Sequence, residues 1–127
     1  MKDIAILYVD DEPDIRLIVE MSLKLHPDID VRIAASGDEA LAMLAKGDWQ
    51  PTLILVDVMM PGMTGPDVLA RLHADRSTAN IPVAFVTARA RPQDIVDYIS
   101  LGAIGVVTKP FNPMSLADEV LALLRRR

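Results

Sequence analysis

The sequence predicts an α/β fold of three layers, a doubly wound parallel sheet with helices on both faces. Three observations support this prediction. Short apolar runs of strand length recur along the 127 residues, and runs that are apolar on both faces are typical of buried parallel strands. Segments with apolar residues at helical spacing separate these runs, so that strand and helix alternate five times. Right-handed crossover connections between such units build a sheet that helices cover on both faces.

Five segments are expected to form the strands. Four of them are apolar along their whole length: Ile4 to Val9, Leu53 to Val56, Val83 to Val86, and Ile104 to Val107. The fifth, Ile29 to Ile33, alternates apolar and polar residues. This alternation favours a strand with one wetter face at the edge of the sheet.

Each strand is followed by a segment that carries a helix-start signal. Pro13 suits the first position of a helix, where its missing N–H has no intrahelical partner. The segment Ser36-Gly37-Asp38-Glu39 has the form of a capping box, which satisfies the first free backbone donors of a helix. The starts of the third, fourth and fifth helices are Pro66, Pro92 and the pair Asn112-Pro113.

Composition limits the classes of function. A chain of 127 residues suits one compact domain, so residues 1–127 are expected to form a single unit. Thirteen basic against eighteen acidic side chains give a formal charge of −5, which disfavours direct binding of nucleic acid or of an anionic membrane. The sequence has no cysteine for disulfides or thiol chemistry, and no apolar run suits a membrane span or signal peptide. We therefore expect a cytoplasmic protein.

Polar residues follow four of the predicted strands at the point where each strand ends. These residues are Asp10 and Asp11, Asp57, Thr87, and the pair Thr108 and Lys109. The carboxyl ends of parallel strands meet at one edge of a sheet, which is where ligands bind in open α/β folds. Carboxylates held together there repel one another unless a cation lies between them. A divalent ion with oxygen ligands suits such a cluster, and Mg²⁺ is the usual one.

Asp57 is the best candidate for a nucleophile, because it stands alone at the end of a central strand. Asp10 and Asp11 are adjacent and suit metal binding. A carboxylate beside Mg²⁺ and the ammonium of Lys109 can accept a phosphoryl group, because both cations neutralise charge on the phosphoryl oxygens. Thr87 is placed to hydrogen-bond one of these oxygens. The predicted product is an aspartyl phosphate.

Four motifs resemble the receiver domain of two-component response regulators, and the likeness covers essentially the whole chain. The motifs are Val9-Asp10-Asp11-Glu12-Pro13, Asp57-Val58-Met59-Met60-Pro61-Gly62-Met63-Thr64-Gly65, Val86-Thr87-Ala88 and Lys109-Pro110-Phe111. The resemblance implies a flavodoxin-like (βα)5 fold with the strand order 2-1-3-4-5.

The resemblance also implies a role for each residue of the site. Asp57 would be the phosphoacceptor of a Mg²⁺-dependent reaction. The expected metal ligands are the carboxylates of Asp11 and Asp57 and the backbone carbonyl of Met59, while Asp10 would orient metal-bound water.

Two further residues acquire roles from the resemblance. Lys109 would pair with the phosphoryl group, and Thr87 would be the switch hydroxyl. The Lys109-Pro110 bond is expected to be cis, a geometry found essentially only before proline.

The family resemblance implies partners as well. The phosphoryl donor would be a phosphohistidine on a sensor histidine kinase or a histidine phosphotransfer protein. Phosphorylation would switch binding to a downstream partner or output domain. The domain would catalyse its own phosphorylation and dephosphorylation without being an enzyme in the usual sense. If it forms a homodimer, we expect the interface on the helix from Pro92, the strand Ile104 to Val107, and the helix from Asn112-Pro113.

One position departs from the family pattern. Receiver domains usually carry an aromatic residue three positions before the lysine, and here that residue is Val106. Because valine has no ring to swing inward, the signal is expected to travel through the segment from Thr87 to Ser100. Tyr98, in that segment, is expected to be partly buried.

Three alternatives remain open. A phosphatase or phosphomutase with an aspartate nucleophile would need an Asp-x-Asp pair after its first strand and a cap insertion, whereas Asp57 is followed by Val58-Met59 and the sequence has no such insertion. A nucleotide-binding domain would need a Gly-rich loop after the first strand, where the sequence has Asp10-Asp11-Glu12-Pro13. A receiver fold that acts without phosphorylation is the third alternative.

Overall fold

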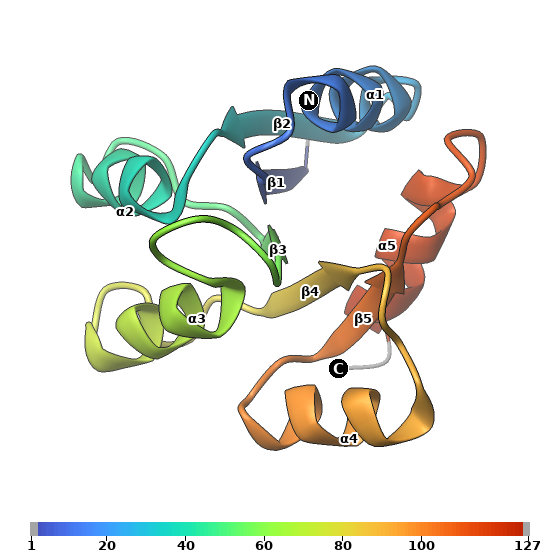
Figure 1. Cartoon of the computed structure of the whole chain (residues 1–127). Helices are drawn as coiled ribbons and strands as arrows, with labels where there is room; N and C mark the ends of the chain where they lie inside the picture. The colour runs from blue at the N-terminus through green and yellow to red at the C-terminus, as the bar shows by residue number, and fades with distance from the viewer. Residues whose placement is uncertain (1–2, 126–127) are drawn as a thin grey trace.

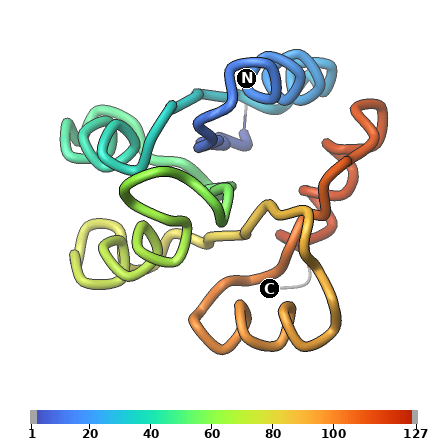
Figure 2. Tube along the Cα trace, viewed as in Figure 1, coloured from blue at the N-terminus to red at the C-terminus, as the bar shows by residue number. Residues whose placement is uncertain are grey.

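The computed structural model describes residues 3–125 as a regular alternation of strands and helices (Figure 1). The strands are β1 (Ile4–Val9), β2 (Ile29–Ala34), β3 (Leu53–Asp57), β4 (Val83–Thr87) and β5 (Gly105–Thr108). The helices are α1 (Pro13–Lys24), α2 (Gly37–Ala45), α3 (Gly65–Ala74), α4 (Pro92–Ser100) and α5 (Leu116–Arg125). The predicted order of five strand–helix units is confirmed, and Figure 2 follows this path along the chain.

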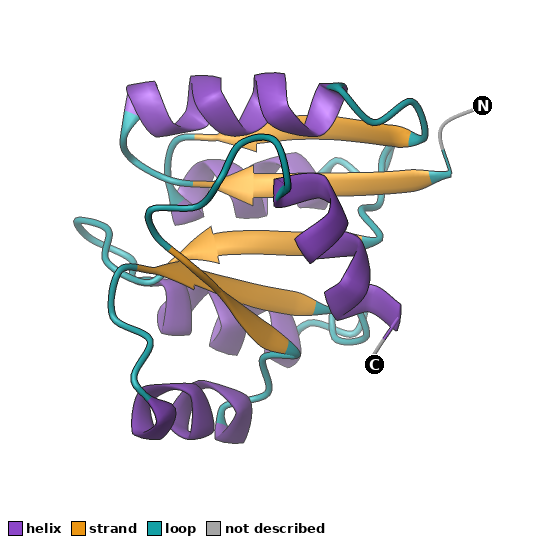
Figure 3. Ribbon diagram, turned by 90° about the vertical axis from the view of Figure 1, so that its right-hand side faces the viewer, coloured by secondary structure: helices purple, strands orange, loops and turns teal. Residues whose placement is uncertain are grey.

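The five strands form one parallel sheet in the order β2-β1-β3-β4-β5. This is the order that the sequence resemblance implies. The strand predicted to lie at an edge, β2, does so. Helices α1 and α5 cover one face of the sheet and α2, α3 and α4 the other (Figures 1 and 3), which gives the predicted three layers.

Two apolar clusters hold these layers together, because alternate residues of each strand point to opposite faces. Leu7, Val9 and Phe85 belong to the cluster that packs against α2, α3 and α4. Ile6 and Tyr8 belong to the cluster beneath α1 and α5. The central strands are buried on both faces, as their unbroken apolar runs predict.

Several element boundaries differ from the sequence prediction. Strands β3 and β4 each run one residue further, to Asp57 and Thr87, because the ladder continues beyond the apolar run: the Val58 N–H donates to the Val86 carbonyl at 3.0 Å. The last strand begins at Gly105 and ends at Thr108. The polar residues of the carboxyl edge are thus partly the last residues of the strands.

The start of the last helix is also corrected. It begins at Leu116, three residues after Pro113. The side chain of Asn112 accepts a hydrogen bond from the Met114 amide at 2.9 Å, which holds a turn before the helix. Asn112-Pro113 therefore forms this turn, and the helix follows it.

The helix caps explain how two other helices start. The Ser36 hydroxyl accepts from the Glu39 amide at 3.1 Å at the start of α2, as predicted. At α3 the helix begins at Gly65, one residue before the predicted Pro66. Thr64 and Asp67 form a reciprocal capping box there, in which each side chain accepts from the other residue's amide.

Candidate phosphoryl-transfer site

Four strands bring the predicted site residues to one edge of the sheet. Asp10 directly follows β1, Asp57 ends β3, Thr87 ends β4, and Lys109 directly follows β5. The strand register places Asp57 opposite Val86, one residue before Thr87. Parallel pairing therefore converges residues that are widely separated in the sequence.

Three carboxylates form a compact acidic cluster. Asp10, Asp11 and Asp57 each offer one oxygen, and these oxygens lie within 4.8 Å of one another. Asp10 is 0% and Asp57 5% exposed, and Asp11 is the more open of the three. Carboxylate oxygens at this spacing suit a hard divalent cation such as Mg²⁺, so the donor set fits the predicted metal.

Lys109 is the only cation among residues 3–125 that forms ion pairs with both buried carboxylates. Its Nζ lies 3.1 Å from Asp10 Oδ2 and 3.4 Å from Asp57 Oδ2. The Glu12 carboxylate lies 3.6 Å away on the outer side. The Lys109-Pro110 bond is cis, as predicted. The ammonium is thus shared among several acids instead of paired with one.

The electrostatics of the cluster leave negative charge uncompensated. Burial, followed by the charge of Asp10, raises the pKa of Asp57 from 3.8 to about 6, although Lys109 and the Met59 amide act in the opposite direction. Burial by itself lowers the pKa of Lys109. The hydrogen bonds and negative charges of Asp10 and Asp57 raise it by more, so the pKa of Lys109 lies above its ordinary value. One ammonium does not balance this group of carboxylates, and a bound divalent cation would.

Thr87 can donate a hydrogen bond at this edge. The side chain is 4% exposed, and its Oγ1 accepts a hydrogen bond from the Arg89 amide at 3.0 Å. Because a hydroxyl both donates and accepts, the proton of Thr87 remains available to an oxygen bound near Asp57. The loop that begins here is held at its far end by Asp94, which contacts the side chains of Arg89 and Arg91.

The backbone of Gly65 lies close to the backbone of Asp57. A Cβ on Gly65 would lie 2.7 Å from the Asp57 carbonyl oxygen, and the Gly65 amide donates to the Val58 carbonyl at 3.0 Å. A side chain at this position would force the backbone to shift. The start of α3 thus packs directly on the end of β3.

The sequence interpretation missed two residues that contact Asp10. The Tyr8 hydroxyl donates to Asp10 Oδ2 at 2.6 Å, and Arg16 donates from its guanidinium to the Asp10 carbonyl at 2.8 Å. Tyr8 lies within an apolar run, and such a run indicates only a place in the core. The available signal was its place two residues before Asp10, because residues i and i+2 of a strand share a face.

The residues around the acceptor differ in how far they reach solvent. Met59 is 76% exposed, whereas Met60 is buried.

Val106 is half-buried in β5. Tyr98 is partly buried, as predicted, and its ring packs edge-on against Phe85 with centroids 5.1 Å apart.

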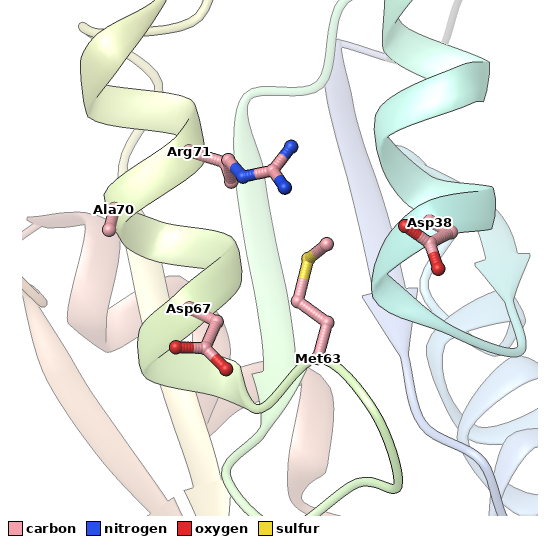
Figure 4. Close-up of a pocket in the computed structure, with 5 residues that line it drawn as sticks. All are labelled: Asp38, Met63, Asp67, Ala70 and Arg71. Carbon is pink, nitrogen blue, oxygen red and sulfur yellow. The ribbon is translucent and has the colours of Figure 1, made fainter.

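A second group of acids lies outside this cluster. A cleft of about 490 Å³ between α2 and α3 is lined by Asp38, Met63, Asp67, Ala70 and Arg71 (Figure 4). The Asp67 carboxylate there already accepts from the Thr64 amide in the capping box. None of the predicted site residues lines this cleft.

No helix within residues 3–125 has both the length and the apolar character needed to cross a membrane.

Comparison with known proteins places these features in one family. The model of the response regulator receiver domain matches residues 6–121. The chain is 34% identical over 125 residues to the chemotaxis protein CheY-3 of Vibrio cholerae, covering 98% of this chain and 95% of that protein. It is 35% identical to the phosphate regulon transcriptional regulatory protein PhoB of Pseudomonas aeruginosa, covering 96% of this chain but only 52% of that one.

Solved structures agree with the sequence comparison. The chemotaxis response regulator CheY4 of Vibrio cholerae superposes with a TM-score of 0.83 at 30% identity, over 94% of this chain and 98% of that one. The chain spans about half the length of several curated relatives, including PhoB, and nearly all of CheY-3. It belongs to the receiver-domain family of two-component response regulators.

Proposed function

We propose that this chain is a phosphorylation switch whose phosphoacceptor is Asp57. One observation carries the proposal: a buried carboxylate lies within reach of two further carboxylates and of the Lys109 ammonium. The carboxylates supply oxygen ligands for a cation, and the Lys109 ammonium supplies a positive charge. These are the two elements that phosphoryl transfer to a carboxylate requires.

The residues Asp10, Asp11 and Asp57 would hold Mg²⁺, with the backbone carbonyl of Met59 as a further ligand. When bound, the ion supplies positive charge that screens the phosphoryl oxygens and aligns the donor. The close spacing of the three carboxylates supports this assignment.

Transfer begins with a deprotonated Asp57. In the metal-free protein the pKa of Asp57 is about 6, so most molecules carry the carboxylate at pH 7 and above. One Asp57 oxygen attacks phosphorus, a new O–P bond forms, and the N–P bond of a phosphohistidine breaks. The electron pair of that bond stays on the imidazole nitrogen of the donor. The product is an aspartyl phosphate on Asp57.

Two side chains stabilise the transferred group. Lys109, now shared between Asp10 and Asp57, would follow the negative charge to a phosphoryl oxygen. Thr87 would donate the hydroxyl proton that remains available while its oxygen accepts from Arg89. Dephosphorylation returns the switch to its starting state: water attacks phosphorus, the O–P bond to Asp57 breaks, and inorganic phosphate leaves. The domain thus promotes its own phosphorylation and dephosphorylation.

We propose that the signal leaves the site through the β4–α4 loop. The hydroxyl of Thr87 is tied to the Arg89 amide, and Arg89 reaches Asp94 in the first turn of α4. A movement of Thr87 toward a phosphoryl oxygen therefore pulls on the segment that leads to Ser100. Val106 has no ring to add to this movement.

The phosphoryl donor would be a sensor histidine kinase or a histidine phosphotransfer protein. Such a donor must cover the carboxyl edge of the sheet to bring its histidine to Asp57. An apolar cleft of about 300 Å³ opens beside Lys109, with Ile15, Ile18 and Phe111 in its walls. The position of this cleft beside Lys109 supports it as a docking site for the donor.

We propose that the output partner, or a second copy of this chain, uses the face formed by α4, β5 and α5. None of the nine residues of α4 is buried, and Val96 and Ile99 are each about half exposed. Unchanged size in light scattering, with and without an acyl-phosphate mimic, would contradict a dimer on this face. The charge of −5 argues against direct binding of nucleic acid.

We further propose that residues 1–127 act as one receiver domain. We also propose that it acts in the cytoplasm, because a chain without cysteine has no disulfides that would require an oxidising compartment. Names such as transcriptional regulatory protein apply to the longer relatives.

The proposal is tested by intact-mass spectrometry after incubation with Mg²⁺ and acetyl phosphate. We expect a single phosphoryl adduct, which Asp57→Asn and excess chelator each abolish. An adduct that persists in Asp57→Asn would place the acceptor elsewhere. Absence of an adduct from a folded wild-type protein that binds Mg²⁺, with the small donor and with a phosphorylated donor protein, would favour a receiver fold that acts without phosphorylation.

A further inference from the structure

A tyrosine lies in the core directly beneath the acidic cluster. Tyr8 is 1% exposed, and its ring belongs to the apolar cluster under α1 and α5. Its hydroxyl donates to Asp10 Oδ2 at 2.6 Å. A bond this short from a hydroxyl to a carboxylate belongs to the strong, charge-assisted class. Tyr8 thus links the apolar core to the phosphoryl-transfer site.

The hydroxyl of Tyr8 can act only as the donor in this bond. Burial, and then the bond to Asp10, raises the pKa of Tyr8 above its ordinary value of 10.0. The Asp10 carboxylate is the acceptor.

Within residues 3–125, three hydrogen bonds to the Asp10 carboxylate are formed. Oδ1 accepts from the Glu12 amide at 3.0 Å, and Oδ2 accepts from Tyr8 and from Lys109 Nζ at 3.1 Å. A carboxylate offers about four acceptor positions. Three are occupied, so the plane of the carboxylate is fixed and the remaining position lies on Oδ1.

We propose that Tyr8 is a positioning residue of the phosphoryl-transfer site, which holds the Asp10 carboxylate in place and limits the hold of Asp10 on Lys109. This inference rests on the proposed function. Without the hydroxyl, Lys109 is the one remaining donor to Oδ2 among residues 3–125. The ammonium then moves closer to Asp10, competes with Mg²⁺ there, and leaves Asp57.

The test is Tyr8→Phe, which keeps the ring and removes only the hydroxyl. A matched control is Thr78→Val, because the Thr78 hydroxyl is also buried and donates to the Leu72 carbonyl at 2.7 Å. That residue lies in the loop that leads into the start of β4, whereas the site lies at the carboxyl ends of the strands. Both variants lose one buried hydroxyl hydrogen bond, and only one of these bonds reaches Asp10.

Three quantities are measured on each folded variant: the Mg²⁺ dissociation constant by calorimetry, the amide resonance of Glu12 by NMR, and the phosphorylation rate at saturating Mg²⁺ and acetyl phosphate. We expect Tyr8→Phe to raise the dissociation constant about tenfold, the factor for about 1.4 kcal/mol, near the lower end for a hydrogen bond to a charged group. The Glu12 resonance moves, because its amide donates to the same carboxylate, and the rate falls. Thr78→Val leaves all three unchanged.

The outcomes separate this inference from the proposed function. If Tyr8→Phe binds Mg²⁺ within about twofold of the wild type and the Glu12 resonance stays in place, Tyr8 has no positioning role. Equal weakening in both variants would also overturn the inference, because it would report a general loss of stability. A wild-type protein that neither binds Mg²⁺ nor accepts a phosphoryl group would instead overturn the proposed function, and with it the inference.

Discussion

Replacing Asp57 by asparagine is expected to stabilise the metal-free protein at neutral pH. Burial and the charge of Asp10 raise the pKa of Asp57 from 3.8 to about 6, so the folded state holds the proton more tightly than the unfolded chain does. Below about pH 4 the carboxyl is protonated in both states and does not oppose folding. Above about pH 6 it is ionised in both states, and its burial near Asp10 then opposes folding.

The magnitude follows from the same two pKa values. A tenfold change in a proton-binding constant corresponds to about 1.4 kcal/mol, so a rise from 3.8 to about 6 corresponds to roughly 3 kcal/mol. The asparagine side chain of the variant carries no charge at any pH. We therefore expect Asp57→Asn to be more stable than the wild type by up to about 3 kcal/mol at pH 8, with the difference vanishing near pH 4.

Urea denaturation in excess chelator, at a series of pH values from 4 to 8, measures the free energy of unfolding of both proteins. Asp48→Asn is the matched control, because Asp48 is an exposed residue of the α2–β3 loop. Mg²⁺ should stabilise the wild type more than Asp57→Asn, since a ligand that binds only the folded state adds to its stability. An Asp57→Asn protein that is no more stable than the wild type at pH 8 would refute the reasoning. So would a stability difference that does not shrink toward pH 4.

Three further predictions follow from individual contacts. Gly65→Ala should lower the free energy of unfolding by about 1–3 kcal/mol, as overpacking does, and slow phosphorylation, because its Cβ would lie 2.7 Å from the Asp57 carbonyl oxygen; urea denaturation and the rate of adduct formation measure both effects. Lys109→Gln removes an ammonium that lowers the pKa of Asp57, so the pKa of Asp57 measured by NMR titration in excess chelator should move above 6, and the phosphorylation rate at saturating Mg²⁺ should fall about tenfold or more; an unchanged pKa would contradict this. Ser36→Ala removes the hydroxyl that accepts from the Glu39 amide and should cost about 1 kcal/mol in urea denaturation, while phosphorylation stays at the wild-type rate.

The fold and the composition of the site could be predicted from the sequence because both depend on local patterns. Apolar runs of strand length alternate with amphipathic segments, and parallel crossovers leave few arrangements for such a chain. The same topology brings the residues at the ends of the strands to one edge. Asp10, Asp57, Thr87 and Lys109 could therefore be assigned to one site before any distance was known.

The boundaries that were wrong depended on single hydrogen bonds. The turn at Asn112, held by the Met114 amide, delays the last helix to Leu116, although Asn-Pro is also a common helix start. The ladder bond from Val58 to Val86 extends β3 to Asp57. Neither bond follows from the periodicity of apolar residues, because each joins a particular pair of atoms.

The tertiary structure alone decided how the charges of the site are shared. Asp10 and Asp57 have the same side chain, yet Asp10 accepts from a buried tyrosine and a lysine, whereas Asp57 has its pKa raised to about 6. The position of Tyr8 two residues before Asp10 indicates a shared face of the strand, but it does not give the distance between the hydroxyl and the carboxylate. Residue types and their order along the chain determined which groups meet at the sheet edge, whereas burial and distance determine the strength of each charge there, and both depend on all the elements packed around it.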